Sequence, residues 1–185
     1  MSLWGNDIKP KNLTDAEKKE VFANTKGWVR EAGSILSGNG NTSADPEVLV
    51  AIGGLSANMG SANITELEFI TTAFDKSDGG TLQVRARFNE PVTVTGTPQL
   101  TVVNDQRANH TLSYASGSTT NELVFSLTIG AANSATNAGD ELSLGANAIS
   151  LNGGTIKDTG QSGTNATITN AASIGTAAGT ITVTA

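Results

Sequence analysis

The sequence is most distinctive for what it lacks. It has no cysteine, a single histidine (His110), four prolines, 4% aromatic residues and 15% charged residues, against about 25% charged residues in an average protein. Without cysteine and with one histidine, it can build neither a cysteine-ligated metal site nor a site with several histidines, and it has no thiol chemistry. A Ser-His-Asp triad would depend on His110 alone. We therefore expect no enzyme activity, no metal site and no cofactor.

Other shortages argue against two classes of partner. The net charge of −6 and the pI of about 4.7 argue against the basic surface that nucleic-acid-binding proteins normally present. No stretch approaches the roughly 18 apolar residues that cross a bilayer. Residues 1–11 contain neither an apolar core nor a small-residue cleavage site, so we expect no secretory signal peptide. These features predict a protein with no nucleic-acid partner and no membrane partner.

What is abundant points to a β-rich scaffold. The chain holds 25 threonines, 21 glycines and 17 asparagines. Threonine is favoured in strands, whereas glycine and asparagine are favoured in tight turns. This composition is typical of an all-β protein built from many short strands.

The charge distribution divides the chain into two regions. Six of the eleven basic residues lie in the first thirty positions, and after Arg107 only Lys157 remains. Such an asymmetry indicates regions with different roles. We predict an N-terminal arm over residues 1–62 and a β domain over residues 63–185.

The arm is expected to be extended, with short elements. Thr14 and Glu17 form a capping-box pattern, which predicts a short helix over residues 16–22. Residues 27–33 have the character of a short strand. Residues 47–52 form a compact apolar run that fits either a buried strand or a short helix, and their length and Val/Ile content favour the strand. Residues 56–63 have the composition of a linker.

The arm also contains large apolar and basic side chains with little around them to bury them. Two interpretations stay open: they pack against the second region, or they anchor the chain to another protein, because aromatic residues are the usual anchors of an interface. On the second interpretation, the anchoring residues are Leu3, Trp4, Ile8, Lys9, Lys11, Phe22 and Trp28.

The second region repeats one pattern. Apolar residues alternate with polar ones over residues 82–89, which predicts a half-buried antiparallel strand with its charges facing outward. Similar short strands recur with turn signals between them, and this regular spacing is typical of a sandwich or a barrel. The predicted strands cover residues 82–89, 92–94, 99–103, 111–114, 122–129, 142–144, 149–151, 155–156, 166–168 and 180–184.

Several motifs of this region resemble the bacterial immunoglobulin-like repeats of large surface proteins. The motifs are Phe-Asn-Glu-Pro-Val at 88–92, Gly-Thr-Pro-Gln-Leu at 96–100, Tyr-Ala-Ser-Gly at 114–117 and the Asn-Ala-Ile-Ser-Leu-Asn-Gly-Gly-Thr-Ile-Lys-Asp run at 147–158. The likeness covers roughly residues 64–160. It implies a mostly β fold, an immunoglobulin-like β-sandwich behind the arm, and a binding or spacer role without a reaction. After residue 158 the sequence departs from the family pattern.

The arm resembles a different group of proteins. Met-Ser-Leu-Trp-Gly-Asn at 1–6, the basic stretch at 9–11, Gly-Trp-Val at 27–29 and Glu-Val-Leu-Val-Ala-Ile at 47–52 are similar to the openings of small virion proteins of tailed phages, those of marine cyanobacteria above all. This likeness implies a particle-associated arm that carries an exposed domain, as in capsid decoration proteins.

Three groups of side chains could carry chemistry, and each also has a plain interpretation. His110 has no partner nearby in sequence and is expected at the surface or in a turn. Asp75 and Asp78 could supply oxygens to calcium, but their spacing is not that of a dedicated loop, and turns select aspartate for backbone reasons. Glu66 and Glu68 share a strand face, as a pair of glycosidase carboxylates would, but the sequence offers no aromatic-lined cleft beside them.

These observations together predict a non-enzymatic virion structural protein. The expected function is that of a capsid decoration (cement) protein, assembled in the host cytoplasm and located in the virion. Its arm would contact the major capsid protein or another virion protein. The alternative is a carbohydrate- or host-surface-binding module of an adhesin or a tail fibre. Self-association and a host-surface glycan stay open as further partners.

Overall fold

The computed structural model describes residues 9–10, 12–34, 40–161 and 163–185. The chain is mostly β, with 46% strand and 9% helix, and its sheets are curled. Two sets of elements are distinguished by separate hydrophobic clusters. We call them the N-terminal unit (residues 9–61) and the C-terminal unit (residues 62–185).

The N-terminal unit is a small antiparallel sheet with a helix at each end. The strands lie in the order β1-β2-β3, and β2 pairs with β3 through a bulge. The part of the predicted arm that the structure describes is therefore folded, where an extended arm was expected. Its elements are α1 (Asp15–Lys19), β1 (Val21–Asn24), β2 (Gly27–Arg30), β3 (Glu47–Ala51) and α2 (Leu55–Asn58).

The capping box that the sequence predicts is present, but the helix is shorter than expected. The Glu17 amide donates to the Thr14 hydroxyl at 3.3 Å, and the Thr14 amide donates to the Glu17 carboxylate at 2.8 Å. The helix ends at Lys19, because Val21 and Phe22 pair with β2 as a strand. Their β-branched and aromatic side chains suit a strand better than a marginal two-turn helix.

Two further expectations for this region need correction. Residues 47–52 do include a strand, but β3 is an edge strand that is largely exposed rather than buried. The predicted linker at 56–63 begins inside α2, and both Leu55 and Met59 belong to the unit's hydrophobic cluster.

The C-terminal unit is one curled sheet of ten strands. Its hydrogen-bonded path runs β12-β6-β9-β8-β7-β10-β13-β5, with β4 attached to β6 and β11 to β7. Every pairing is antiparallel except that of β13 with β5. The elements are β4 (Ile64–Phe69), β5 (Phe74–Asp75), β6 (Gly80–Thr95), β7 (Gln99–Asn104), β8 (His110–Ser116), β9 (Thr120–Ile129), β10 (Glu141–Ser143), β11 (Ile149–Ser150), β12 (Thr155–Asp158), α3 (Ala172–Ala177) and β13 (Thr180–Thr184).

The long strand β6 organises this unit. Its first half pairs with β4 and β9, and the alternation predicted from the sequence is confirmed, since Leu82, Val84, Ala86 and Phe88 are all buried. The proline at 91 does not end the strand. Instead, the register shifts between Arg87 and residue 92, and the second half of β6 pairs with β12.

The region after β12 differs most from expectation. Residues 166–168 do not form a strand; Asn165 and Thr167 make only isolated bridges. The short helix α3 was not predicted. Gly175 lets it pack closely, because a β-carbon there would lie 2.4 Å from the Leu144 carbonyl oxygen.

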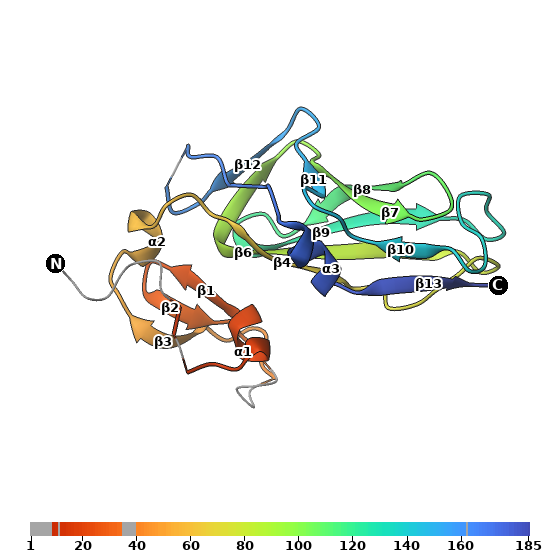
Figure 1. The fold of residues 1–185 in the computed structure, drawn as a ribbon. Helices are drawn as coiled ribbons and strands as arrows, with labels where there is room; N and C mark the ends of the chain where they lie inside the picture. The colour runs from red at the N-terminus through yellow and green to blue at the C-terminus, as the bar shows by residue number, and fades with distance from the viewer. Residues whose placement is uncertain (1–8, 11, 35–39, 162) are drawn as a thin grey trace.

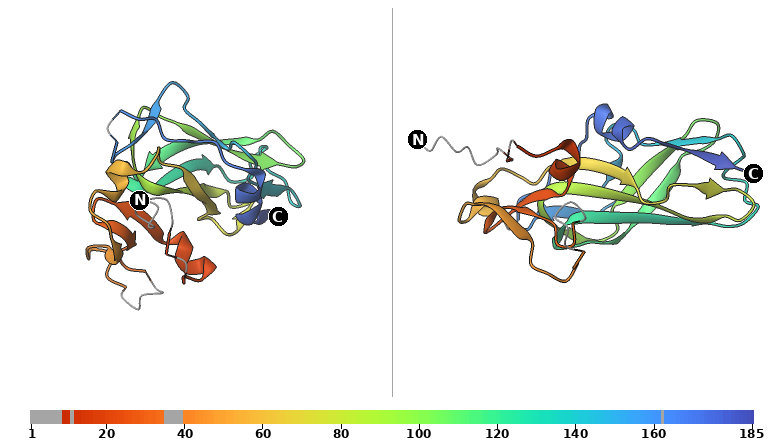
Figure 2. Two further views of the ribbon diagram at one scale, coloured as in Figure 1. Left: turned by 60° about the vertical axis from the view of Figure 1, so that its left-hand side comes forward. Right: turned by 90° about the horizontal axis from the view of Figure 1, so that it is seen from below.

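The molecule is elongated, with the N-terminal unit at one end (Figures 1 and 2). The opposite end is made of loops that follow or precede β5, β7, β9 and β13. Backbone hydrogen bonds join these loops to one another. The Lys76 amide donates to the Thr184 carbonyl, the Ala132 amide donates to the Lys76 carbonyl, and the Gly139 amide donates to the Val183 carbonyl. The chain terminus after β13 lies at this far end (Figure 1).

Candidate functional site: the junction between the two units

The residues predicted to anchor the arm lie in different environments. Leu3, Trp4, Ile8 and Lys11 lie outside the described residues. Lys9 is half-buried, and its ammonium donates to the Lys18 carbonyl at 3.2 Å.

Phe22 and Trp28 are buried inside the chain itself, with 7% and 2% of their surface exposed. Trp28 lies opposite Ala23 in the β1–β2 pair and belongs to the small cluster of the N-terminal unit. Phe22 lies opposite Val29, on the other face of that pair. Both faces of the two strands are therefore covered, and in this arrangement neither aromatic ring offers surface to a partner.

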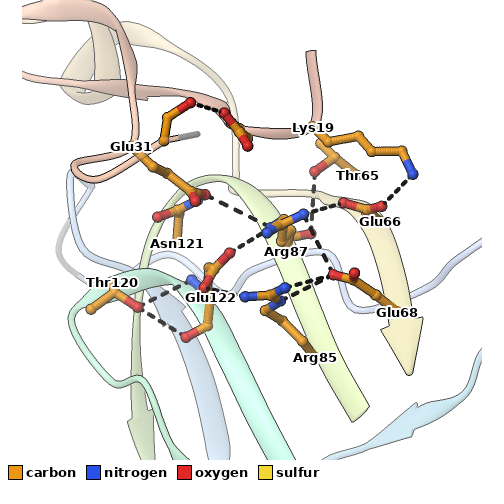
Figure 3. Close-up of polar contacts among 12 residues, drawn as sticks. Lys19, Glu31, Thr65, Glu66, Glu68, Arg85, Arg87, Thr120, Asn121 and Glu122 are labelled. Carbon is orange, nitrogen blue, oxygen red and sulfur yellow. Dashed lines mark hydrogen bonds and ion pairs between the residues drawn. The ribbon is translucent and has the colours of Figure 1, made fainter. Parts of the chain in front are cut away.

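The densest group of charged side chains lies where the two units meet (Figure 3). At its centre is Arg87 of β6, whose side chain is 10% exposed. Its Nη1 contacts Glu66 at 2.7 Å, and its Nε contacts Glu122 at 2.5 Å and Glu31 at 3.8 Å. Glu66 and Glu122 come from the strands on either side of β6, whereas Glu31 comes from the N-terminal unit.

The strand register explains why these side chains converge. Arg87 is directly opposite Glu66 on β4 and opposite Glu122 on β9. Arg85, two residues earlier, points to the same face and is opposite Glu68, which it contacts at 2.7 Å. Opposite charges thus face each other across neighbouring strands, an arrangement that stabilises sheets.

The N-terminal unit covers this charged face. Lys19 of α1 contacts Glu66 at 2.9 Å. The Asn121 amide of β9 donates to Glu31 at 3.2 Å. As a result, Arg87 and Glu66 are nearly enclosed, with side-chain exposures of 10% and 11%.

The cluster perturbs the acidity of its members in opposite directions. Although burial works against both charges, hydrogen bonds from Lys19 and Arg87 hold the pKa of Glu66 below its ordinary value, and the carboxylates of Glu122 and Glu66 hold the pKa of Arg87 above its own. Burial and the neighbouring Glu122 carboxylate raise the pKa of Glu31 to about 7, against the pull of Arg87.

Hydrogen bonds to the main chain complete the junction near the connecting segment. The Ala62 amide donates to the buried Asp158 carboxylate at 3.0 Å, and the Thr167 amide donates to the Ala62 carbonyl at 2.7 Å. Gln161 donates to the Met59 carbonyl. These bonds tie both ends of residues 59–62 to the C-terminal unit.

An open groove of about 580 Å³ lies beside these contacts. Its lining combines an ammonium with amide and hydroxyl side chains, but the Trp28 ring at its wall is almost entirely buried and offers no face for stacking a sugar. The groove is lined by Lys9, Trp28, Met59, Gly60, Ser61, Asn63, Thr65 and Asn89.

The side chains considered for catalysis or metal binding have structural partners. Glu66 and Glu68, the hypothetical glycosidase pair, are held by arginines, and the lowered pKa of Glu66 does not suit a general acid. Asp75 accepts a bond from the Ser77 amide of its own loop at 2.7 Å and another from the Thr184 hydroxyl of β13 at 3.0 Å. Among the described residues, no group of three or more His, Asp or Glu side chains could hold a metal ion.

His110 is not the surface histidine that was expected. It is 4% exposed at the start of β8, because it lies two residues before Leu112 and so shares the inward face of the strand with it. Burial lowers its pKa, although Asp140 works in the opposite direction.

The role of the arginines does not follow from the local sequence pattern. The alternation over residues 82–89 predicts that Arg85 and Arg87 face solvent, whereas the N-terminal unit covers Arg87. One signal was available in the sequence. The glutamates at 66 and 68 are two residues apart, as are the arginines at 85 and 87, so each pair lies on one face of a strand. The two pairs have complementary charges if the two strands pair. Nothing in the local sequence marks Glu31.

No helix in the described part of the chain is long and apolar enough to cross a membrane. Comparison with known proteins found no match among family models, curated proteins or solved structures.

Proposed function

We propose that the protein is a non-enzymatic virion structural protein, a capsid decoration protein held on a phage head through its N-terminal region. In this proposal the C-terminal unit is an immunoglobulin-like domain displayed outward. Its antiparallel strands, and the way β6 pairs first with β9 and then with β12, support such a fold. The resemblances of the arm and of residues 64–160 supply the virion context.

One observation carries this proposal: the N-terminal unit and the joined loops of the C-terminal unit lie at opposite ends of an elongated molecule (Figure 1). A protein attached at one end would project the other away from the shell. The charge distribution suits this orientation. Residues 1–62 carry six basic and seven acidic side chains, whereas residues 63–185 carry five basic and ten acidic ones. A displayed acidic surface keeps particles apart in solution.

The burial of Phe22 and Trp28 changes which residues would make the attachment. Trp28 belongs to the cluster of the N-terminal unit and Phe22 is buried on the other face of its strands, so the proposed contact with the capsid protein rests on Leu3, Trp4, Ile8 and Lys11. Trp4 is the strongest candidate anchor, because tryptophan is enriched among interface residues that dominate binding energy.

The test is co-sedimentation of the purified chain with phage heads that lack their decoration protein. The full chain should bind to saturation. Trp4→Ala should weaken attachment by more than about 1 kcal/mol, which is more than about fivefold in Kd. Leu151→Ala is the matched control, because it removes a 37% exposed apolar side chain from the C-terminal unit, and it should bind like the unaltered chain.

A second variant lacks residues 1–60. The cut is placed there because the Ala62 amide and carbonyl both bond to the C-terminal unit. This variant should fold and fail to sediment with heads. Sedimentation at full strength would move the attachment to the C-terminal unit, and failure of the full chain to bind any head would refute the decoration role.

The alternative function, a carbohydrate- or surface-binding module, finds support in the hydroxyl and amide side chains that line the 580 Å³ groove. It predicts that the full chain binds host polysaccharide and that Asn89→Leu, at the groove wall, abolishes the binding. Silence on a glycan array would count against it.

A further inference from the structure

The charge cluster of the junction contains one carboxylate more than its cations hold well. Glu66 is contacted by Lys19 at 2.9 Å and by Arg87 at 2.7 Å. Glu68 is held by Arg85 at 2.7 Å. These contacts engage three cations of the junction, and two further carboxylates share the two arginines.

The two remaining carboxylates are those of Glu31 and Glu122, and they belong to different units. Glu122 takes the short contact with Arg87 Nε at 2.5 Å, while Glu31 lies 3.8 Å from the same nitrogen. Glu122 is also contacted by Arg85 at 3.3 Å, whereas Glu31 accepts a hydrogen bond from the amide of Asn121 at 3.2 Å. Docking the N-terminal unit therefore places the less well-paired carboxylate beside Glu122.

We propose that the Glu31–Glu122 carboxyl pair makes the docking of the two units depend on protons: the junction is closed while the pair shares a proton and loosens when both groups are ionised. The device does not depend on the proposed virion role. It concerns how firmly one end of the molecule is held by the other.

The groups that face Glu31 come from each element packed against it. Strand β6 supplies Arg87, and β9 supplies Glu122 and the neutral amide of Asn121. From the N-terminal unit itself, the Lys9 ammonium attracts both Glu31 and Glu66. Burial and repulsion by Glu122 both disfavour the ionised form of Glu31, so the direction of the effect follows from these two causes.

The sign of the pH dependence follows from linkage. The pKa of Glu31 is about 7 in the docked state and near 4.3 in an unfolded chain. Between these values the docked state binds more protons, so docking weakens as the pH rises from about 4.5 to about 7 and levels off above that. Glu66 acts oppositely, because its pKa is lowered, but only in more acidic solution.

The experiment follows the Trp28 fluorescence of the full chain during urea unfolding at pH 5 and at pH 8, in a Trp4→Phe background so that Trp28 reports alone. The docking equilibrium constant should fall by about tenfold or more between the two pH values. Glu31→Gln should remove this difference, because glutamine keeps the shape of the protonated acid. At pH 8 it should make the junction firmer than in the unaltered chain.

Two variants identify the titrating group. Glu141→Gln removes the same charge from an exposed position at the start of β10 and should keep the full pH dependence. Lys9→Met should also keep it. If Lys9→Met abolishes the dependence, Lys9 rather than Glu31 responds to pH and the proposal is overturned.

A direct measurement guards against a variant that does not fold. Carbon-13 NMR of glutamate carboxyl groups in the full chain should find one group that titrates near neutral pH and that is missing in Glu31→Gln. If every glutamate of the unaltered chain titrates below about pH 5.5, the junction carries no such pair and the proposal fails.

Discussion

The two units bury their side chains by different means. Among the described residues, the C-terminal unit gathers 24 buried hydrophobic residues into one cluster, whereas the cluster of the N-terminal unit has five. A core of five side chains does not stabilise a unit of this size on its own. The larger unit is self-sufficient, and the smaller one depends on its attachment.

The attachment itself contrasts with both cores, because it is largely polar. Arg87, Glu66 and Glu31 are covered when the units meet, and buried charges contribute stability only while all partners remain in place. A polar joint of this kind is specific in geometry and sensitive to the loss of a single member. The N-terminal unit should therefore open without the C-terminal unit, and never the reverse.

The strongest test of this asymmetry compares two equivalent core substitutions. Leu123→Ala removes a fully buried side chain from β9, and Leu55→Ala removes one from α2. Each should cost about 3 kcal/mol. Leu123→Ala should lower the unfolding midpoint seen by Trp28 fluorescence and by circular dichroism, whereas Leu55→Ala should lower the Trp28 midpoint alone.

The probes separate the units because of where the aromatic residues lie. Both tryptophans precede residue 62, whereas the single tyrosine, Tyr114, lies in the C-terminal unit. There its ring meets that of Phe125 edge-on, with 6.2 Å between the ring centroids. If Leu55→Ala shifts the Tyr114 signal as far as Leu123→Ala does, the molecule unfolds as one cooperative body and the comparison is wrong.

The next test addresses the joint with two arginines of the same strand face. Arg87→Met leaves Glu31, Glu66 and Glu122 without their shared partner and should weaken docking by about 3 kcal/mol. Arg85→Met affects a more exposed side chain (27%) and should cost about 1 kcal/mol or less. The measurement is the Trp28 unfolding midpoint at pH 6. Equal losses would mean that Arg87 has no special role at the junction.

The mostly β character and most strands of the C-terminal unit could be predicted from the sequence, because these strands carry a local signal; the two-residue strand β5 is not among the predicted strands. The alternation from Leu82 to Phe88 fixes which face is buried, and glycine- and asparagine-rich turns mark most strand ends. The signals fail where structure depends on tertiary packing. Helix α3 has weak helix-forming residues, and its close approach to Leu144 through Gly175 is a property of the folded chain.

The junction could not be predicted for a similar reason. Charges on a half-buried strand normally face solvent, and only the docked N-terminal unit turns Arg87 into a buried residue. Trp28 illustrates the opposite case. The sequence left open whether Trp28 packs against the second region or forms an interface, but the β1–β2 pairing brings it against Ala23 and α2 covers it. In both cases the deciding contact is with residues distant in sequence.

A smaller effect is expected at the helix that supplies Lys19 to the junction. Thr14→Ala removes the hydroxyl that caps α1 and should cost about 1 kcal/mol, felt by the N-terminal unit alone. Thr14→Ser keeps the hydroxyl and serves as the control. The measurement is again the Trp28 midpoint, compared with that of Tyr114. A shift of the Tyr114 signal would show that the cap stabilises the whole molecule.

The smallest expected effect concerns pH, and it sets the two units against each other. Because burial lowers the pKa of His110, the unfolded chain binds more protons than the folded one below about pH 6.5. The C-terminal unit should therefore lose stability as the pH falls through that range. The junction should become firmer over the same range, since the pKa of Glu31 is raised rather than lowered.

The unfolding midpoints reported by Tyr114 and by Trp28 should then move in opposite directions between pH 7.5 and pH 5.5. The His110→Gln substitution should flatten only the trend reported by Tyr114. A Tyr114 trend that persists unchanged in His110→Gln would assign the acid sensitivity of the C-terminal unit to its carboxylates instead.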